Sequence, residues 1–307
     1  MRVVDYLAVL LVMLIWGLNF TVAKIALDQL SPLMLTALRS VMVAALLVPF
    51  FRVPRAMLGR VFLVSLTMGS FHFPLLFTGL SGVDAGVAAF AIQLQVPFSV
   101  ILARILLKDR FTWLQAAGIV VAFTGVAIIG GEPRTLGSLV ALLCIVAASF
   151  AWAVSNIQVK HLEGVSGLAL SAWVSLFAAP QVLAASLLTE TGQWDQLRNL
   201  DAAAWGALAY MALLVTVLSY AIWYWLVQRH PLTLVVPYTL TVPLFGVISA
   251  VIVLGEPLTG YLVGGGLLII LGLAITMRPG LDRALRKFWL RSLPRSSATL
   301  PMDRASK

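Results

Sequence analysis

One stretch of this chain occurs twice: Trp-Gly-Leu-Asn-Phe-Thr-Val-Ala-Lys covers residues 16–24, and Trp-Ala-Val-Ser-Asn-Ile-Gln-Val-Lys covers residues 152–160. Further residues recur later in the same order and at nearly the same spacing. These pairs are Pro97 with Pro243, Asp109 with Glu256, Thr112 with Thr259, Gly118 with Gly265, and Gly125 with Gly272. The sequence therefore predicts an internal duplication, with a first repeat over residues 1–131 and a second over residues 135–278.

The composition is that of a membrane protein, since 61% of the residues are hydrophobic, 11% are charged and the mean hydropathy is +1.00. Such values are typical of a helical protein that crosses the bilayer several times. The apolar run from Tyr6 to about Ile25 is too long for the core of a signal peptide, and no small-x-small cleavage site follows it. We expect this run to be the first span. The chain has one cysteine, Cys144, which excludes an intrachain disulfide.

Apolar stretches bounded by polar residues, Gly or Pro predict ten transmembrane helices. Each has roughly the 17–25 residues that a helix needs to cross the hydrocarbon core. The candidate spans lie near residues 5–27, 31–51, 61–80, 84–106, 112–130, 135–159, 166–188, 203–228, 232–254 and 259–277. The loops between them are short, so there is no room for a separate catalytic domain.

Lys and Arg are distributed unevenly over the predicted loops, and this asymmetry predicts the orientation. Seventeen of the 21 basic residues fall on one side of the predicted membrane. The opposite side has Lys24, Arg134 and Arg198, and Arg39 lies within a span. We therefore expect both termini in the cytoplasm, at a bacterial inner membrane. The net charge of +9 then reflects cytoplasmic loops, and no nucleic-acid partner is predicted.

Each repeat would contain five spans, and an odd number places the second repeat upside down relative to the first. Inverted repeats in a helical membrane protein are typical of transporters that alternate access about a site near the midplane. The predicted fold class is an all-α membrane protein with ten transmembrane helices in two inverted five-helix repeats.

Three motifs carry a resemblance to a known family: Trp-Gly-Leu-Asn-Phe at 16–20, Lys-Asp-Arg-Phe-Thr at 108–112, and Leu-Gly-Glu-Pro-Leu-Thr-Gly at 254–260. Together with the duplication, they resemble the drug/metabolite transporter superfamily, and most of all its EamA-type exporters, which include cysteine and O-acetylserine exporters. The resemblance implies ten helices around a central cavity and the export of amino acids and other metabolites. The basic amphipathic stretch at 281–291, within the tail 279–307, is predicted to lie on anionic cytoplasmic lipid.

Ionisable side chains inside a span are costly and therefore mark candidate functional sites. Lys24 lies near the outer end of the first span, where we expect its amine to extend to the interface. Arg39 either binds a substrate carboxylate or caps carbonyls of a neighbouring helix. His72 is either a satisfied buried histidine, a substrate contact or a proton carrier. No Asp or Glu falls centrally in a span, so transport would be uniport or couple through His72 or through the substrate's own titration.

Uncharged polar groups and prolines indicate the substrate site. Proline removes the helical partner of the carbonyl four residues earlier, so Pro97 frees that of Gln93 and Pro243 frees that of Thr239. Freed carbonyls are tolerated where they line a cavity or meet a side chain. We predict substrate contacts from Trp16, Asn19, His72, Gln93, Gln95, Trp152, Asn156, Tyr220, Tyr238 and Thr241. No cofactor or metal is predicted.

The glycines that recur seven residues apart, at 118 and 125 and at 265 and 272, predict close helix packing, either within one repeat or at a homodimer contact. The predicted function is a secondary exporter of small polar metabolites, most of all amino acids or their derivatives. Nucleosides, sugars or organic cations are alternative solutes. An integral-membrane enzyme is disfavoured because the sequence lacks an acidic cluster and any GxSxG, HExxH or P-loop pattern.

Overall fold

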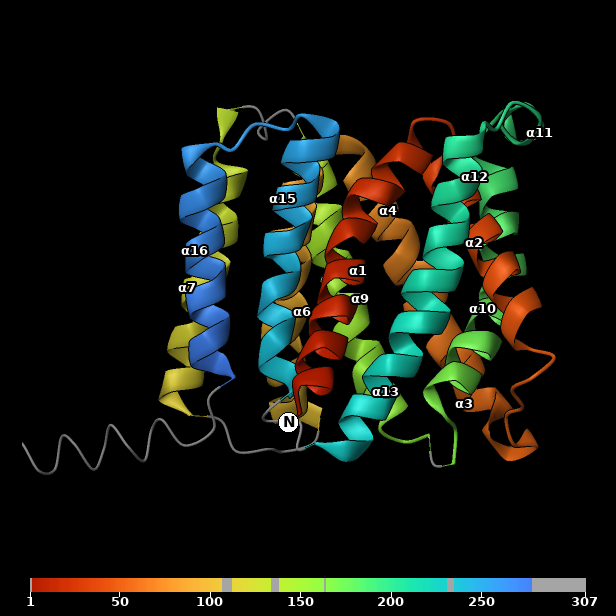
Figure 1. The fold of residues 1–307 in the computed structure, drawn as a ribbon, viewed down its shortest axis with the longest axis horizontal. Helices are drawn as coiled ribbons and strands as arrows, with labels where there is room; N and C mark the ends of the chain where they lie inside the picture. Colours follow the sequence, from red (N-terminus) through yellow and green to blue (C-terminus); the bar gives the residue numbers. More distant parts are fainter. Residues whose placement is uncertain (1, 107–111, 134–137, 163, 231–234, 278–307) are drawn as a thin grey trace, which may run out of the picture.

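The computed structural model describes residues 2–106, 112–133, 138–162, 164–230 and 235–277, and the regular elements in these ranges are helices (Figure 1). Residues 108–111 of the turn motif, the stretch at 281–291 and the tail 279–307 lie outside the described residues.

Seven helices of the described chain are long and apolar enough to cross a membrane. They are Val3–Leu27 (α1), Arg55–Gly82, Ala85–Leu106, Trp113–Gly130 (α7), Leu139–Val159 (α9), Gly167–Thr189 (α10) and Ala202–Trp223. Three predicted spans coincide with shorter apolar helices, which are Pro32–Leu47 (α2), Tyr238–Leu254 and Gly260–Thr276 (α16). The protein is thus an all-α, multi-pass membrane protein, while the full set of ten crossings stays a prediction. The short helix α11 (Gln193–Arg198) was not predicted.

The helices run side by side along one common direction, and α1 begins at the same edge of the bundle at which α16 ends (Figure 1). We call this the N-terminal edge and the other the opposite edge. The main buried apolar cluster extends through the bundle around α1, with Met13, Phe77 and Met211 almost fully buried. Helix α1 packs against α12 (Ala202–Ala209), α13 (Ser219–Arg229) and α15 (Val242–Leu254). Helix α9 packs against α3 (Leu58–Val64), α4 (Phe73–Gly82) and α6 (Gln95–Leu106).

Four of the predicted spans are not continuous α-helices. The third and the eighth contain a π-helical segment, the fourth and the ninth contain a 3-10 segment, and a further 3-10 turn, η1 (Arg55–Met57), precedes the third. The broken helices consist of η1 (Arg55–Met57), α3 (Leu58–Val64), η2 (Ser65–His72) and α4 (Phe73–Gly82); α5 (Ala85–Ala91), η3 (Ile92–Leu94) and α6 (Gln95–Leu106); α12 (Ala202–Ala209), η4 (Tyr210–Leu218) and α13 (Ser219–Arg229); and η5 (Val236–Thr241) and α15 (Val242–Leu254). Here η2 and η4 are π-helical, and η3 and η5 are 3-10 segments.

Hydroxyl groups stabilise the π-helical segments by hydrogen bonding to main-chain carbonyls. In η4, Thr216 donates to the carbonyl of Met211 at 3.0 Å, and Ser219, just after it, donates to that of Val215. In η2, Ser65 donates to the carbonyl of Phe62 at 2.7 Å. Carbonyls in an apolar bundle need such partners, and π-helical segments often lie at functional sites.

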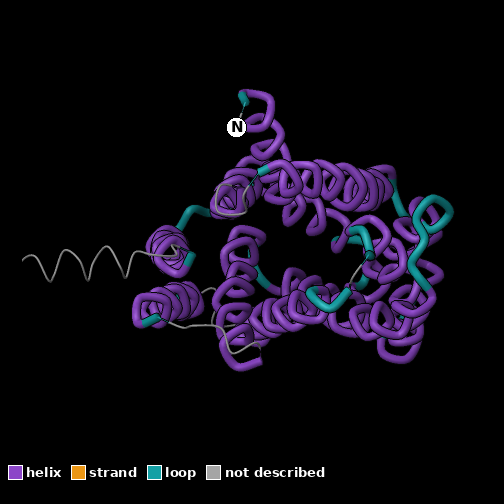
Figure 2. Tube along the Cα trace, turned by 90° about the horizontal axis from the view of Figure 1, so that it is seen from below, coloured by secondary structure: helices purple, strands orange, loops and turns teal. Residues whose placement is uncertain are grey.

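Helices α7 and α16 form a close pair at one end of the bundle (Figures 1 and 2). The recurring glycines lie between them. A Cβ atom added at Gly125 would be 2.5 Å from the carbonyl oxygen of Gly265, and one added at Gly265 would be 2.5 Å from that of Gly125. The prediction of close packing is confirmed, but the two glycine faces come from different repeats of one chain. They are occupied within the chain and do not supply a homodimer surface.

We predict that Gly265→Ala destabilises the protein, because the new methyl group meets main chain of α7 that cannot move without displacing the helix. Overpacking of this kind costs about 1–3 kcal/mol. The matched control is Gly264→Ala, since nothing lies within 4 Å of a Cβ built at Gly264. Thermal unfolding in detergent should show a lower Tm for Gly265→Ala only. Equal Tm values for both variants would contradict the tight α7–α16 contact.

Candidate functional site

A cavity of about 160 Å³ lies where the irregular helix segments meet. Seven of the ten predicted contact residues line it. They are Trp16, Asn19, His72, Gln93, Gln95, Trp152 and Tyr220. They come from both repeats. All four irregular segments line the cavity, through His72 in η2, Gln93 in η3, Val215 in η4 and Thr239 in η5. The cavity is smaller than the about 300–1,000 Å³ of sites for drug-sized ligands, so it suits a small solute.

The other three predicted residues do not line this cavity. Asn156 is exposed, and its amide lies 3.5 Å from the hydroxyl of Ser99. Tyr238 packs edge-on against Tyr6, with 6.3 Å between the ring centroids. Thr241 donates to the carbonyl of Tyr238 at 2.7 Å, so its hydroxyl serves its own helix.

Trp16 is held in position by neighbours on α13. Its indole N–H donates to the hydroxyl of Ser219 at 2.7 Å. Its ring meets Tyr220 edge-on at 6.0 Å and Trp223 at 5.3 Å between centroids. These contacts bring together residues more than 200 positions apart, and they present one side of the indole ring to the cavity.

His72 is almost fully buried, and the position of its ring indicates which nitrogen carries the proton. Nδ1 lies 2.8 Å from the main-chain carbonyl oxygen of Ala148. Because a carbonyl only accepts hydrogen bonds, the ring proton belongs on Nδ1, and Nε2 of the neutral ring is an acceptor. The ring lies between Phe73 and Trp152, at 4.8 and 4.7 Å between centroids.

At Pro243 the structure shows the side-chain contact that we predicted for the carbonyl four residues before a proline. The carbonyl of Thr239 loses its α-helical partner at Pro243 but accepts the backbone N–H of Val242 in the 3-10 turn. It also accepts a hydrogen bond from the Gln93 side chain at 3.3 Å. Gln93 is 4% exposed and lies in η3, just before Pro97. One proline-containing helix therefore supplies a side chain that adds a hydrogen bond to a carbonyl of the other.

Arg39 also lines the cavity, although the sequence left its role open between structure and substrate binding. Its side chain donates to the hydroxyl of Thr216 at 3.2 Å, and its guanidinium lies 4.0 Å from the centroid of the Phe73 ring. Only 5% of the residue is exposed. No carboxylate lies within ion-pair distance of Arg39 in the described residues, whose ion pairs join Lys24 to Glu256 and Asp5 to His230.

Asn19 is, after Arg39, a second polar residue at the cavity, and one of its side-chain atoms lacks a partner among the described residues. Its Oδ1 is buried and accepts no hydrogen bond from the described residues. Leaving a buried acceptor unpaired costs about 1–3 kcal/mol, so such an atom at a cavity wall calls for a ligand. The one-turn spacing from Trp16, visible in the sequence, places both side chains on the cavity side of α1.

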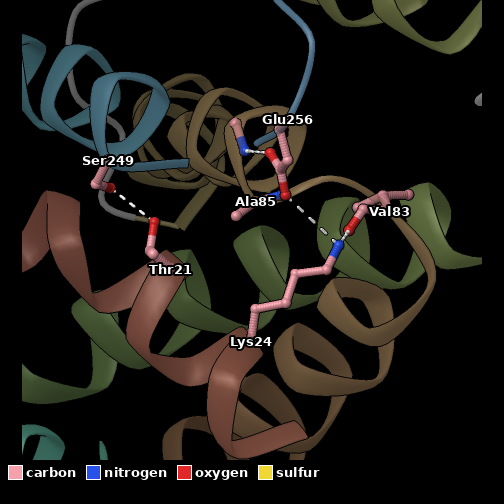
Figure 3. A network of polar contacts seen from close by, with 7 residues as sticks. Thr21, Lys24, Val83, Ala85, Ser249 and Glu256 are labelled. Carbon is pink, nitrogen blue, oxygen red and sulfur yellow. Dashed lines mark hydrogen bonds and ion pairs between the residues drawn. The ribbon is translucent and has the colours of Figure 1, made fainter. Parts of the chain in front are cut away.

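At the opposite edge, the Leu-Gly-Glu-Pro motif takes part in a network of polar contacts with α1 and the start of α5 (Figure 3). The Glu256 carboxylate accepts from the backbone N–H groups of Ala85 at 2.7 Å and Gly86 at 3.0 Å, at the start of α5. Lys24 lies 3.7 Å from Glu256 and donates to the carbonyl of Val83. The Lys24 side chain is 24% exposed and its amine contacts a carboxylate and a carbonyl, while its extension to the interface stays a prediction. We call Lys24, Glu256 and the start of α5 the clamp.

Local backbone geometry explains the motif. Gly255 ends α15 with φ of 67°, a left-handed conformation that favours glycine and turns the chain so that Glu256 points back towards α5. Thr259 then caps α16 by accepting from the N–H of Leu262 at 3.1 Å. Below the clamp, Thr21 and Ser249 join α1 to α15 through hydroxyls 2.7 Å apart.

These features define a multi-pass helical membrane protein with a small polar and aromatic cavity at its centre. The EamA-like transporter family matches this chain twice, over residues 4–131 and 139–278, and the chain belongs to this family. It is accordingly an EamA-type exporter of the drug/metabolite transporter superfamily, and a transporter rather than an enzyme.

Similar proteins extend over almost the whole chain. A probable amino-acid metabolite efflux pump of Salmonella typhimurium is 34% identical, and the match covers 89% of this chain and 94% of the relative. Its Escherichia coli namesake is 33% identical over the same shares. A probable terminal-alkyne amino-acid exporter of Streptantibioticus cattleyicolor is 27% identical over 90% and 94%. One crystal structure, 19% identical, has the same fold, with a TM-score of 0.60 over 93% of this chain and 99% of that chain.

We predict that Glu256→Gln destabilises the protein by about 1.5–3 kcal/mol, the usual value of hydrogen bonds to a charged group. The amide keeps the side-chain shape but loses the charge and one acceptor. Asp28→Asn is the control, because Asp28 is an exposed acid at the end of α1. The measurement is Tm in detergent, and Asp28→Asn should leave it nearly unchanged. A Tm drop that is equal in the two variants would mean that only net charge matters.

Proposed function

We propose that this protein exports amino acids or closely related metabolites by alternating access, as a secondary transporter of the bacterial inner membrane. In this proposal ten helices cross the membrane as two inverted repeats, 1–131 and 135–278, with both termini in the cytoplasm. The observation that carries it is the cavity, because both repeats build its walls and its polar groups converge near the middle of the bundle.

The arrangement of the helices supports the inverted repeats. A π-helical segment interrupts the third and the eighth predicted span, and a 3-10 segment interrupts the fourth and the ninth. The packing of α1 against α12–α13 and α15 corresponds to that of α9 against α3–α4 and α6. Both patterns are what a two-fold relation between five-helix units produces.

The relatives support the class of solute. Two are named as amino-acid metabolite efflux pumps and one as an amino-acid exporter. The cavity is consistent with these names, because it is small and combines amide groups with aromatic and aliphatic walls. Its size fits nucleosides and sugars less well, and those solutes remain the alternatives.

The clamp supports alternating access. It joins α1, α5 and α15 at the opposite edge, which is the predicted outer face, and the Thr21–Ser249 contact adds to it (Figure 3). Release of a solute on that side requires α1 and α15 to separate there. The clamp is built from polar contacts that can break and re-form, which suits an element with two arrangements.

Efflux from preloaded proteoliposomes tests the function. We expect selective, saturable release of at least one of cysteine, O-acetylserine, threonine and the aromatic amino acids. Asn19→Ala and Gln95→Ala should reduce release, because each removes a polar group from the cavity. If a pH gradient accelerates release and His72→Ala abolishes the acceleration, His72 is the coupling residue.

The control for this assay is Gly264→Ala, because Gly264 does not line the cavity and a Cβ built there has nothing within 4 Å. Folded wild-type protein that releases none of these amino acids, with or without a pH gradient, would overturn the amino-acid assignment. Nucleosides, sugars and organic cations would then be tested in the same vesicles.

A disulfide lock tests alternating access. Thr21→Cys with Ser249→Cys, made in a Cys144→Ala background, places two thiols where the hydroxyls are 2.7 Å apart, a separation that a disulfide can bridge. We expect oxidation to stop efflux and reduction to restore it, since the lock holds α1 against α15. Each single cysteine variant is a control and should be insensitive to oxidant. Full efflux by the cross-linked protein would exclude an opening between these two helices.

A further inference from the structure

Arg39 places a positive charge at the cavity wall without a carboxylate partner among the described residues. An ionised side chain within a membrane span normally pairs with an opposite charge or faces a cavity that binds one. A guanidinium has five N–H donors, and in the described part of the chain one of them has an acceptor in Thr216. The Phe73 ring supports the guanidinium plane but neutralises little of its charge.

The groups around Arg39 do not neutralise its positive charge. His72 and Tyr220 lie close enough to Arg39 to interact with it electrostatically. The His72 ring donates through Nδ1 to Ala148 and contributes no negative charge in its neutral form. The residues that line the cavity include no Asp or Glu. The described cavity lining around Arg39 therefore lacks a negatively charged group, which an anionic group of a ligand would supply.

Asn19 provides the complementary group in the same cavity. Its Oδ1 accepts no hydrogen bond from the described residues. Rotation about the last side-chain torsion is easy for asparagine, and turning Oδ1 towards the cavity would break no hydrogen bond to that oxygen. An amide oxygen is a good acceptor for an ammonium group, which has three donors and no acceptor.

We infer that Arg39 and Asn19 together recognise the zwitterionic head group of the exported solute: Arg39 binds the carboxylate and Asn19 accepts a hydrogen bond from the ammonium. The inference rests on the proposed export of amino acids and names the groups that select them. A planar guanidinium matches a carboxylate through two parallel hydrogen bonds, which a lone amide cannot provide.

The remaining walls suit the part of an amino acid beyond its head group. The lining is completed by Phe20, Leu76, Phe77, Ile92, Val215 and Val242. These side chains are apolar, and the volume of about 160 Å³ excludes a large side chain on the solute. The cavity therefore favours α-amino acids with small or modestly sized apolar side chains over dicarboxylates, which would bring a second charge that nothing in the lining neutralises.

The test compares three forms of each amino acid: the free acid, its carboxamide and its N-acetyl derivative. The compounds are cysteine, O-acetylserine and threonine, and binding to purified protein in detergent is measured from the ligand-dependent rise in Tm. We expect wild-type protein to bind the free acid about 10- to 100-fold more tightly than either derivative, the range for a lost hydrogen bond to a charged group.

Each variant should lose one preference only. Arg39→Gln should bind the free acid about 10- to 100-fold more weakly and no longer distinguish it from the amide, while it still disfavours the N-acetyl form. Asn19→Ala should show the reverse pattern. Thr216→Val removes the intraprotein partner of Arg39 and should keep both preferences. Arg198→Gln is the matched control, because Arg198 also stacks on an aromatic ring, that of Trp194, but lies in α11 outside the cavity.

The outcomes separate the inference from the function on which it rests. If Arg39→Gln weakens acid and amide equally, Arg39 only supports the structure and the inference is overturned while export stands. If wild-type protein binds acid and amide equally, the inference also fails. If Arg39→Gln does not fold, Arg39→Lys, which keeps the charge without the planar fork, should retain part of the preference for the acid. If no form of any compound binds to or is released by folded protein, the proposed function fails together with the inference.

Discussion

The need to satisfy main-chain polar groups inside an apolar bundle determines the architecture of this protein. Where η2, η3, η4 and η5 replace regular α-helix, side chains add hydrogen bonds to the main-chain carbonyls. Gln93 donates to the carbonyl of Thr239, and Thr216 donates to a carbonyl within its own helix. Such hydrogen bonds are possible only where polar side chains can gather, and the place where they gather is the cavity. The irregular helix segments and the polar cavity thus both follow from the need to satisfy main-chain polar groups.

Charge is distributed according to the same constraint. At the opposite edge, Glu256 and Lys24 satisfy each other and the start of α5, and Glu190 caps the start of α2 by accepting from Leu33 at 2.9 Å and Met34 at 3.2 Å. Carboxylates are favourable there because helix N-termini carry partial positive charge. In the centre, Arg39 stands without such a partner in the described residues. Charges at the opposite edge are paired and stabilise the structure. The Arg39 charge at the cavity has no carboxylate partner among the described residues, and it is the one to which we assign a function.

Close packing between the repeats sets a second limit on how the protein can move. Gly118, Gly125, Gly265 and Gly272 bring α7 and α16 so near that a methyl group has no room. This pair joins the two repeats at one end of the bundle (Figure 1), and the clamp residue Glu256 lies in the connection between α15 and α16. Helix α1 packs on α15 just as closely at Gly17, where an added Cβ would be 2.8 Å from the carbonyl oxygen of Val242.

The sequence by itself determined the all-α membrane class, the family and seven of the residues that line the cavity. Apolar runs mark helices whatever surrounds them, and the Trp–Asn spacing and the prolines mark positions where a helix turns polar groups to one side. What the local pattern could not decide is which helices face each other. Only the tertiary structure pairs Gln93 with Thr239, joins Lys24 to Glu256, turns Asn156 and Tyr238 away from the cavity and leaves Arg39 facing it. These outcomes depend on contacts between residues distant in the chain, and a helical period gives the face of a residue but not its neighbour on another helix.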